Sequence, residues 1–138
     1  LYNEDYDAAS PPSYSRFRNQ VQAADGVLFV TPEYNRGMSA AMKNAIDVGS
    51  RPPVQNVWNN KPCAVISASP STIGGMGANM QLRQSLVVLN APCMPMECYL
   101  HSVHLAFNEQ GELSSEPVQK LLAKFVFALQ EWVNRFKE

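Results

Sequence analysis

The sequence has almost no net charge, few cysteines and no long apolar run. Its 11 Lys and Arg residues nearly balance 12 Asp and Glu residues, which leaves a formal net charge of -1 at pH 7. A chain without a basic excess lacks electrostatic attraction for nucleic acids and anionic membranes, so neither is an expected partner. The longest apolar runs are strand-sized, well short of the roughly 20 residues that a membrane-spanning helix needs. We therefore expect no span across a bilayer.

The cysteine and histidine side chains, which are common metal ligands, do not indicate a metal site in this sequence. Cys63, Cys93 and Cys98 are an odd number without metal-ligand spacing, and each lies in an apolar segment. A free thiol in such a segment usually behaves as a small hydrophobic group. His101 and His104 have no Cys or carboxylate ligand nearby in the sequence. Because no signal-peptide pattern precedes the globular pattern, we expect buried thiols in a reducing cytoplasm.

Apolar periodicity predicts alternating helices and strands. Apolar residues at helical spacing indicate amphipathic helices, whereas continuous β-branched and aromatic runs indicate strands that are buried on both faces. A length of 138 residues suits a single domain over 1–138 and is too short for two. The expected helices cover 14–24, 40–49, 79–89 and 118–136, and the expected strands cover 27–30, 63–66 and 92–100.

This order of elements predicts a doubly wound α/β fold, with a parallel sheet between two layers of helices. Ligands of such sheets bind in the crevice beyond the carboxyl ends of the strands. The loops over 31–37 and 67–77 follow the first two expected strands, so a site is expected there. The segment 51–60 is expected to be a surface loop because of its prolines and amide side chains. The glycines of the second loop match neither the dinucleotide-binding fingerprint nor the Walker loop.

Several segments together resemble one family. Thr31-Pro32-Glu33-Tyr34-Asn35 leaves a buried strand and leads to the helical run Met42-Lys43-Asn44-Ala45-Ile46-Asp47. With the further collinear matches, the chain resembles the NAD(P)H-dependent FMN reductases, which include bacterial quinone and chromate reductases. The resemblance implies a flavodoxin-like, three-layer αβα fold. The further matches are Ser50-Arg51-Pro52, Lys61-Pro62, Gly74-Gly75, Leu82-Arg83-Gln84-Ser85-Leu86 and Asn90-Ala91.

The resemblance implies that both loops line the isoalloxazine ring of FMN. Pro32 fixes its own φ angle and withholds a donor, while the N–H groups that follow stay free to meet the ring acceptors. Hydroxyls and glycines in the second loop would let the backbone approach a flat ligand. Each loop taken alone is also compatible with an ordinary turn or a flexible connection. The expected cofactor contacts are Pro32, Glu33, Tyr34, Asn35, Ser69, Ser71, Gly74 and Gly75.

The implied activity is that of an FMN-dependent oxidoreductase. NADPH or NADH would reduce the flavin and leave, and an acceptor such as a quinone would then take the electrons. No catalytic side chain is expected, because the cofactors supply the reacting atoms. Two alternatives stay open at this point: a non-enzymatic electron carrier of the flavodoxin type, and an inactive fragment of such a reductase.

The resemblance also bears on assembly and on the ends of the sheet. Relatives form dimers and tetramers, which predicts a homodimer or homotetramer with Arg83 and Glu97 as a candidate interface pair. The family's phosphate-binding turn has no counterpart in this sequence, and Leu1-Tyr2-Asn3 resembles the segment after the second strand of relatives. In the strand order 2-1-3-4-5 the first two strands would be missing, so Val27 to Val30 is expected to form an edge.

Overall fold

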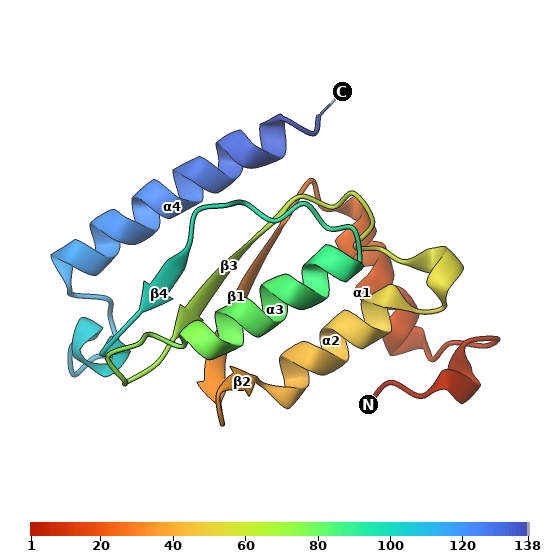
Figure 1. The fold of residues 1–138 in the computed structure, drawn as a ribbon, viewed down its shortest axis with the longest axis horizontal. Helices are drawn as coiled ribbons and strands as arrows, with labels where there is room; N and C mark the ends of the chain where they lie inside the picture. The colour runs from red at the N-terminus through yellow and green to blue at the C-terminus, as the bar shows by residue number, and fades with distance from the viewer. Residues whose placement is uncertain (138) are drawn as a thin grey trace.

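Helices and strands alternate through residues 1–137, the part of the chain that the computed structural model describes (Figure 1). Each expected helix and strand has a counterpart, and β2 and three short 3-10 helices are additional. The order is η1 (Glu4–Tyr6), α1 (Pro12–Ala23), β1 (Val27–Tyr34), β2 (Gly37–Met38), α2 (Ala40–Ser50), η2 (Pro53–Gln55), β3 (Cys63–Ala68), α3 (Met76–Val88), β4 (Cys98–Leu100), η3 (Val103–Ala106) and α4 (Glu116–Asn134).

The sheet has the strand order β2-β1-β3-β4. β1 and β3 run parallel over six residue pairs, from Val27 opposite Cys63 to Pro32 opposite Ala68, and β4 runs parallel to β3. β2 is antiparallel to the end of β1. Parallel pairing of the three expected strands is therefore confirmed, and a short antiparallel strand is added to it.

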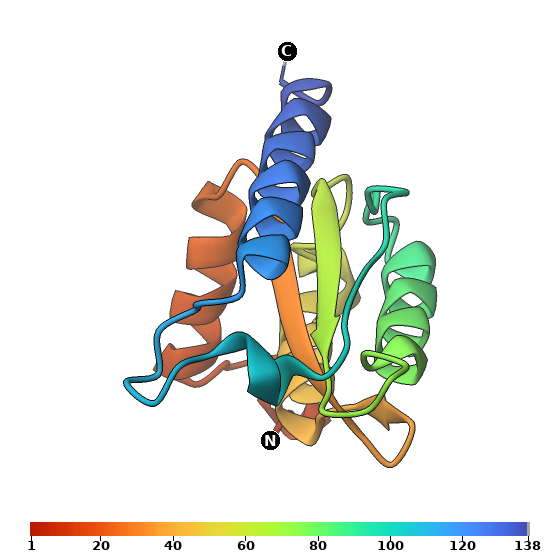
Figure 2. The same ribbon diagram turned by 90° about the vertical axis from the view of Figure 1, so that its left-hand side faces the viewer.

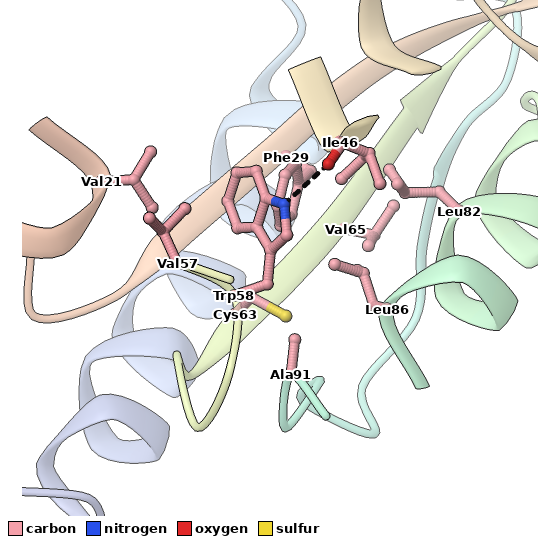
Figure 3. Close-up of a cluster of buried hydrophobic side chains, with 10 residues drawn as sticks. All are labelled: Val21, Phe29, Ile46, Val57, Trp58, Cys63, Val65, Leu82, Leu86 and Ala91. Atoms are coloured by element: carbon pink, nitrogen blue, oxygen red, sulfur yellow. Dashed lines mark hydrogen bonds between the residues drawn. The ribbon is translucent and has the colours of Figure 1, made fainter. Parts of the chain in front are cut away.

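One face of the sheet packs against α2 and α3 around the side chain of Trp58 (Figure 3). Trp58 is only 1% exposed, its Nε1 donates to the Ile46 carbonyl at 2.9 Å, and its ring lies 5.4 Å from that of Phe29. The expectation of a surface loop over 51–60 is wrong for Trp58 and its neighbour Val57. A tryptophan side chain is stable in a protein core when its indole N–H donates a hydrogen bond to an acceptor there.

The opposite face packs against α4 (Figure 2). Ala64 and Ile66 of β3 form a cluster there with Phe125 of α4, whose side chain is fully buried. Helices on both faces, as the sequence predicts, are therefore confirmed. The residues of β1 on this face are less covered: Leu28 is 37% exposed and Val30 is 57% exposed.

The long edge of the sheet is formed by β1. Its residues Val27 to Pro32 pair with β3 on one side, and the residues of β1 that pair with β2 are Glu33 and Tyr34. Among the described residues no strand pairs with the other side of Val27 to Pro32. The expectation that this strand forms an edge is confirmed.

The third expected strand is much shorter than its apolar pattern indicates. β4 has only three residues, and the segment before it touches β3 through a single bridge between Cys63 and Cys93. Pro92 and Pro95 lack the N–H groups that a continuous ladder needs. The strand expected over 92–100 is therefore wrong for its first six residues.

Candidate functional site

The two loops that the sequence singles out lie side by side. β1 and β3 are neighbours in the sheet, and their last pair is Pro32 with Ala68. The loop after β1 therefore lies next to the loop after β3 at the carboxyl edge of the sheet, where ligands of parallel sheets bind. This edge is the candidate functional site.

The first loop is a tight β-hairpin. β1 continues to Tyr34, beyond the expected end at Val30, and returns as β2 after Asn35 and Arg36. Both turn residues have positive φ angles, 51° and 66°, which is the backbone of a type I′ turn. Neither turn N–H donates to an acceptor within the described residues. Tyr34 is 63% exposed, so the hairpin presents an aromatic side chain and free backbone donors at the surface.

Glu33 joins the first loop to the helix that follows the second loop. Its side chain is only 10% exposed, and Oε2 accepts the backbone N–H of Ala78 at 3.0 Å. α3 begins after Gly75 without a side-chain cap of its own, so Glu33 supplies the acceptor from another segment. A carboxylate in this position is also favoured by the helix dipole. The structure thus gives Glu33 a contact within the protein.

Gly77 allows this close approach. A Cβ at Gly77 would lie 2.7 Å from the Arg36 carbonyl oxygen and 2.8 Å from Oε2 of Glu33. Such distances are not tolerated without a shift of the hairpin. The first turn of α3 therefore packs directly beneath the hairpin, which fixes the spacing of the two loops.

The second loop is organised by its own hydroxyl groups. Ser69 is buried, and its Oγ accepts the backbone N–H of Ser71 at 3.1 Å and lies 3.1 Å from the Ser71 hydroxyl. The carbonyls of the same two serines accept the N–H groups of Val103 and Ser102. Ser69 is engaged inside the loop, whereas Ser71 is exposed and able to reach a ligand.

The glycines of this loop pack against the protein's own strands. Gly74 and Gly75 have φ angles of 61° and 77°, which side chains rarely adopt. A Cβ on Gly74 would lie 2.8 Å from the Tyr99 carbonyl carbon, and one on Gly75 would lie 3.1 Å from Cβ of Ser67. These contacts account for both glycines by local packing, so their expected role toward a cofactor stays a prediction.

Asn79 supports the second loop and was not among the expected site residues. It is fully buried in α3, and its Nδ2 donates to the Ser67 hydroxyl at 3.3 Å and the Cys98 carbonyl at 3.3 Å. The Ser67 hydroxyl donates in turn to the Gly74 carbonyl at 2.8 Å. The signal in the sequence was the position of Asn79. It lies three residues before the buried Leu82 and therefore on the same face of the helix.

Arg83 extends this network away from the loops. Its Nε donates to Oδ1 of Asn79 at 2.8 Å, and its two terminal nitrogens donate to the carbonyls of Met94 at 2.9 Å and Met96 at 3.0 Å. Within the part of the chain described here, Arg83 forms no ion pair with Glu97. Its contacts brace the segment before β4, and a role between subunits stays a prediction.

Comparison with known proteins identifies the family. A family model described as NADPH-dependent FMN reductase matches residues 1–104. Over 136 residues the chain is 50% identical to a quinone reductase of Pseudomonas putida, covering 97% of this chain and 73% of that protein. The chain belongs to the NADPH-dependent FMN reductase family. It is also 44% identical to an NAD(P)H-dependent FMN reductase of Pseudomonas aeruginosa, covering 99% of this chain and 75% of that one.

A solved structure supports the fold of this family member. FerB, a flavoenzyme NAD(P)H:(acceptor) oxidoreductase from Paracoccus denitrificans, superposes with a TM-score of 0.89 at 38% sequence identity. The match covers 98% of this chain and 75% of FerB. The predicted family and the predicted flavodoxin-like α/β fold are confirmed.

The exposed groups at the two loops fit the ring of the family's cofactor, FMN. Tyr34 offers a flat aromatic side chain, Asn35 and Arg36 offer free backbone N–H groups, and Ser71 offers a hydroxyl. A flavin ring has a flat face and hydrogen-bond acceptors along its edge, which such groups satisfy. The Ser- and Arg-bearing turn that the resemblance leads us to expect for the phosphate has no counterpart among the described residues.

Other features of the described residues complete the site's surroundings. A cavity of about 420 Å³ lies beyond β4, beside the second loop, and is lined by His101, Ser102, Leu105 and the start of α4.

No three His, Cys, Asp or Glu side chains in residues 1–137 are placed to hold a metal ion. No helix in this range is both long and apolar enough to cross a membrane.

Proposed function

We propose that this protein is an FMN-dependent oxidoreductase that takes hydride from NADPH or NADH and reduces a quinone or a similar small acceptor. The observation that carries the proposal is the pairing of the two loops at the carboxyl edge of the sheet, where Tyr34 and the turn N–H groups are exposed. Half of the aligned residues are shared with a relative named quinone reductase, which supports the choice of acceptor.

The chain's own residues have a positioning task in this reaction. Bound FMN supplies the two-electron chemistry, so the protein needs only to hold the ring and leave one face open. The hairpin would meet the ring edge through the turn N–H groups, and Tyr34 would pack against its surface. The hydrogen bond from the Ala78 N–H to the Glu33 carboxylate keeps the hairpin at a fixed distance from the second loop. By fixing the spacing of the two loops, these residues would hold the ring in one orientation and would leave room for a donor or an acceptor to approach it.

Several finer points belong to this proposal. The cofactor contacts would be Pro32, Glu33, Tyr34, Asn35, Ser69, Ser71, Gly74 and Gly75, of which Pro32, Tyr34, Asn35 and Ser71 are exposed. A homodimer or homotetramer would place residues of a second subunit near the open face. A cytoplasmic location is supported by three free cysteines.

Rapid mixing tests the activity directly. The flavin-loaded protein is mixed anaerobically with NADPH, and the flavin absorbance is followed before a quinone is added. We expect bleaching by NADPH and recovery of the absorbance on addition of the quinone. A protein that loads with FMN but is not bleached by NADPH or NADH is instead an electron carrier. A protein that does not load with FMN at all points to the inactive-fragment alternative.

A further inference from the structure

Two of the three cysteines face each other at the end of the sheet remote from the two loops. Cys63 begins β3, and Cys93 lies directly opposite it in an isolated parallel bridge. The bridge is framed by two backbone bonds, from Cys63 N–H to the Pro92 carbonyl at 3.0 Å and from Met94 N–H to the Cys63 carbonyl at 2.7 Å. Paired positions on neighbouring strands lie roughly 4.7–4.9 Å apart, within the Cα separation of about 4.4–6.8 Å that disulfides adopt.

The two thiols differ in access to solvent. Cys63 is 1% exposed and belongs to the core, whereas Cys93 is partly exposed. Cys93 also lines an open pocket of about 420 Å³ together with Arg83 and Phe136. A small reagent that enters this pocket reaches the sulfur of Cys93 first.

The surroundings of Cys93 favour its thiolate form. Nη1 of Arg83 donates to the Cys93 sulfur at 3.4 Å, and Cys63 is paired with Cys93 across the bridge. The hydrogen bond from Cys63 and the charge of Arg83 lower the pKa of Cys93, whereas the same pairing and burial raise the pKa of Cys63. An accessible thiolate beside a cation and next to a second thiol is the arrangement of a reactive cysteine with a resolving partner.

We propose that Cys93 is an oxidative modification site at which a hydroperoxide reacts, and that Cys63 resolves the product into an internal disulfide. In the first step the Cys93 thiolate attacks the peroxide. A sulfur–oxygen bond forms, the oxygen–oxygen bond breaks, and the alkoxide or hydroxide that leaves takes up a proton from solvent to become an alcohol or water. In the second step the sulfur of Cys63 displaces hydroxide from the sulfenic acid of Cys93, and the proton of Cys63 leaves with it as water.

Cys98 provides a matched control inside the same chain. It is 2% exposed and packs on the opposite face of the sheet with Phe125. Burial raises the pKa of Cys98, and no cation or second thiol lies beside it in the described structure. Cys98 is as buried as Cys63, so oxidation governed by burial alone would leave both of them unreactive, whereas the pair predicts that Cys63 and not Cys98 becomes linked to Cys93.

The experiment is peptide mapping of the native, fully reduced protein after exposure to a small excess of hydrogen peroxide, with free thiols blocked by an alkylating agent. We expect the peptides of Cys63 and Cys93 to be joined and to separate on treatment with dithiothreitol, while Cys98 stays reduced. In Cys63→Ala, the sulfenic acid of Cys93 should instead be trapped by dimedone. In Cys93→Ser, Cys63 should resist peroxide.

A measurement on the unaltered protein guards against variants that fold poorly. Under native conditions a small alkylating agent should modify Cys93 at least about tenfold faster than Cys98, because a thiolate fraction changes about tenfold per unit of pKa. Equal rates for Cys93 and Cys98 would overturn the proposal. So would peroxide-treated protein in which Cys63 and Cys93 remain unlinked, or in which either is linked to Cys98.

Discussion

The carboxylate of Glu33 accepts the backbone N–H of Ala78 at 3.0 Å, across 45 residues of sequence. This bond joins the hairpin after β1 to the first turn of α3, and Gly77 between them leaves no room for a Cβ. The spacing of the two loops at the candidate flavin site is therefore set by a contact between protein groups. Changes to this contact should affect stability and flavin binding together.

Replacing Glu33 tests that contact. Glu33→Ala leaves the first turn of α3 without its acceptor, and we expect the free energy of unfolding to fall by about 1–2 kcal/mol, the usual cost of losing a helix cap. Glu33→Gln keeps an acceptor but removes the charge, so its loss should be smaller. Urea unfolding measures both, with Glu109→Ala at an exposed position as the control. Equal stability of all three variants and the wild type would show that the bond does not support α3.

Gly77→Ala tests the close approach of the hairpin. The new Cβ would meet the Arg36 carbonyl oxygen at 2.7 Å, and overpacking of this kind costs about 1–3 kcal/mol. Gly111→Ala is the matched control because it has nothing within 4 Å of its Cβ and only a strained φ of 78°. We expect thermal unfolding to show a larger loss for Gly77→Ala, and fluorescence titration to show weaker FMN binding in that variant alone.

The sequence predicted the elements whose patterns were unambiguous. The runs at Val27 and Cys63 are continuous and β-branched, and both form the parallel strands they indicate. The segment from Pro92 is also apolar, but its prolines prevent a continuous ladder of backbone hydrogen bonds. A prediction from apolarity alone therefore made the strand too long. The hairpin turn at Asn35 and Arg36 was missed because neither of its two central residues is a glycine. Its positive φ angles fall on Asn35 and Arg36, and Arg rarely occupies this region.

Topology placed the two loops side by side at one edge of the sheet, as the structure has them, but the contacts within and between the loops were not predictable. Local patterns place Glu33 in a loop and Asn79 in a helix, yet the partners of both come from segments distant in sequence. The buried Trp58 is a similar case, because its acceptor at Ile46 becomes available only when α2 is in place. Long-range pairing of polar groups has no periodicity, so a single sequence does not reveal it.

The exposed tyrosine of the hairpin should contribute to cofactor binding and little to stability. Tyr34 is 63% exposed, so Tyr34→Ala should change the free energy of unfolding by less than about 0.5 kcal/mol. Its loss should weaken FMN binding by about tenfold, because an aromatic stacking contact is worth about 0.5–1.5 kcal/mol beyond its area. Titration of flavin fluorescence measures the affinity. A variant that binds FMN as tightly as the wild type would remove Tyr34 from the site.

The reactivity of Cys93 should depend on pH in a way that reports its neighbours. The hydrogen bond from Cys63 and the charge of Arg83 lower the pKa of Cys93 to about 7. Alkylation should therefore rise as pH increases through about 7, rather than near 8.5 as for an unperturbed thiol. In Arg83→Met the rise should move to higher pH. Among residues 1–137, the charged or titratable groups that face Cys93 are Arg83 from α3 and Cys63 from β3.

The open edge of β1 should make the chain of 138 residues associate with itself. Val27 to Pro32 leave one row of backbone groups unpaired, and Val30 is 57% exposed beside them without a charge that would discourage pairing. Edges of this kind recruit further strands, and a lysine placed on them usually prevents it. We expect sedimentation velocity to show association that grows with concentration and that Val30→Lys reduces. The control is Val54→Lys, at a 92% exposed position outside the sheet, which should associate like the wild type. If both variants sediment as the wild type does, the contact lies elsewhere, and the apolar groove between α4 and the segment around Met94 and Met96 is the next surface to test.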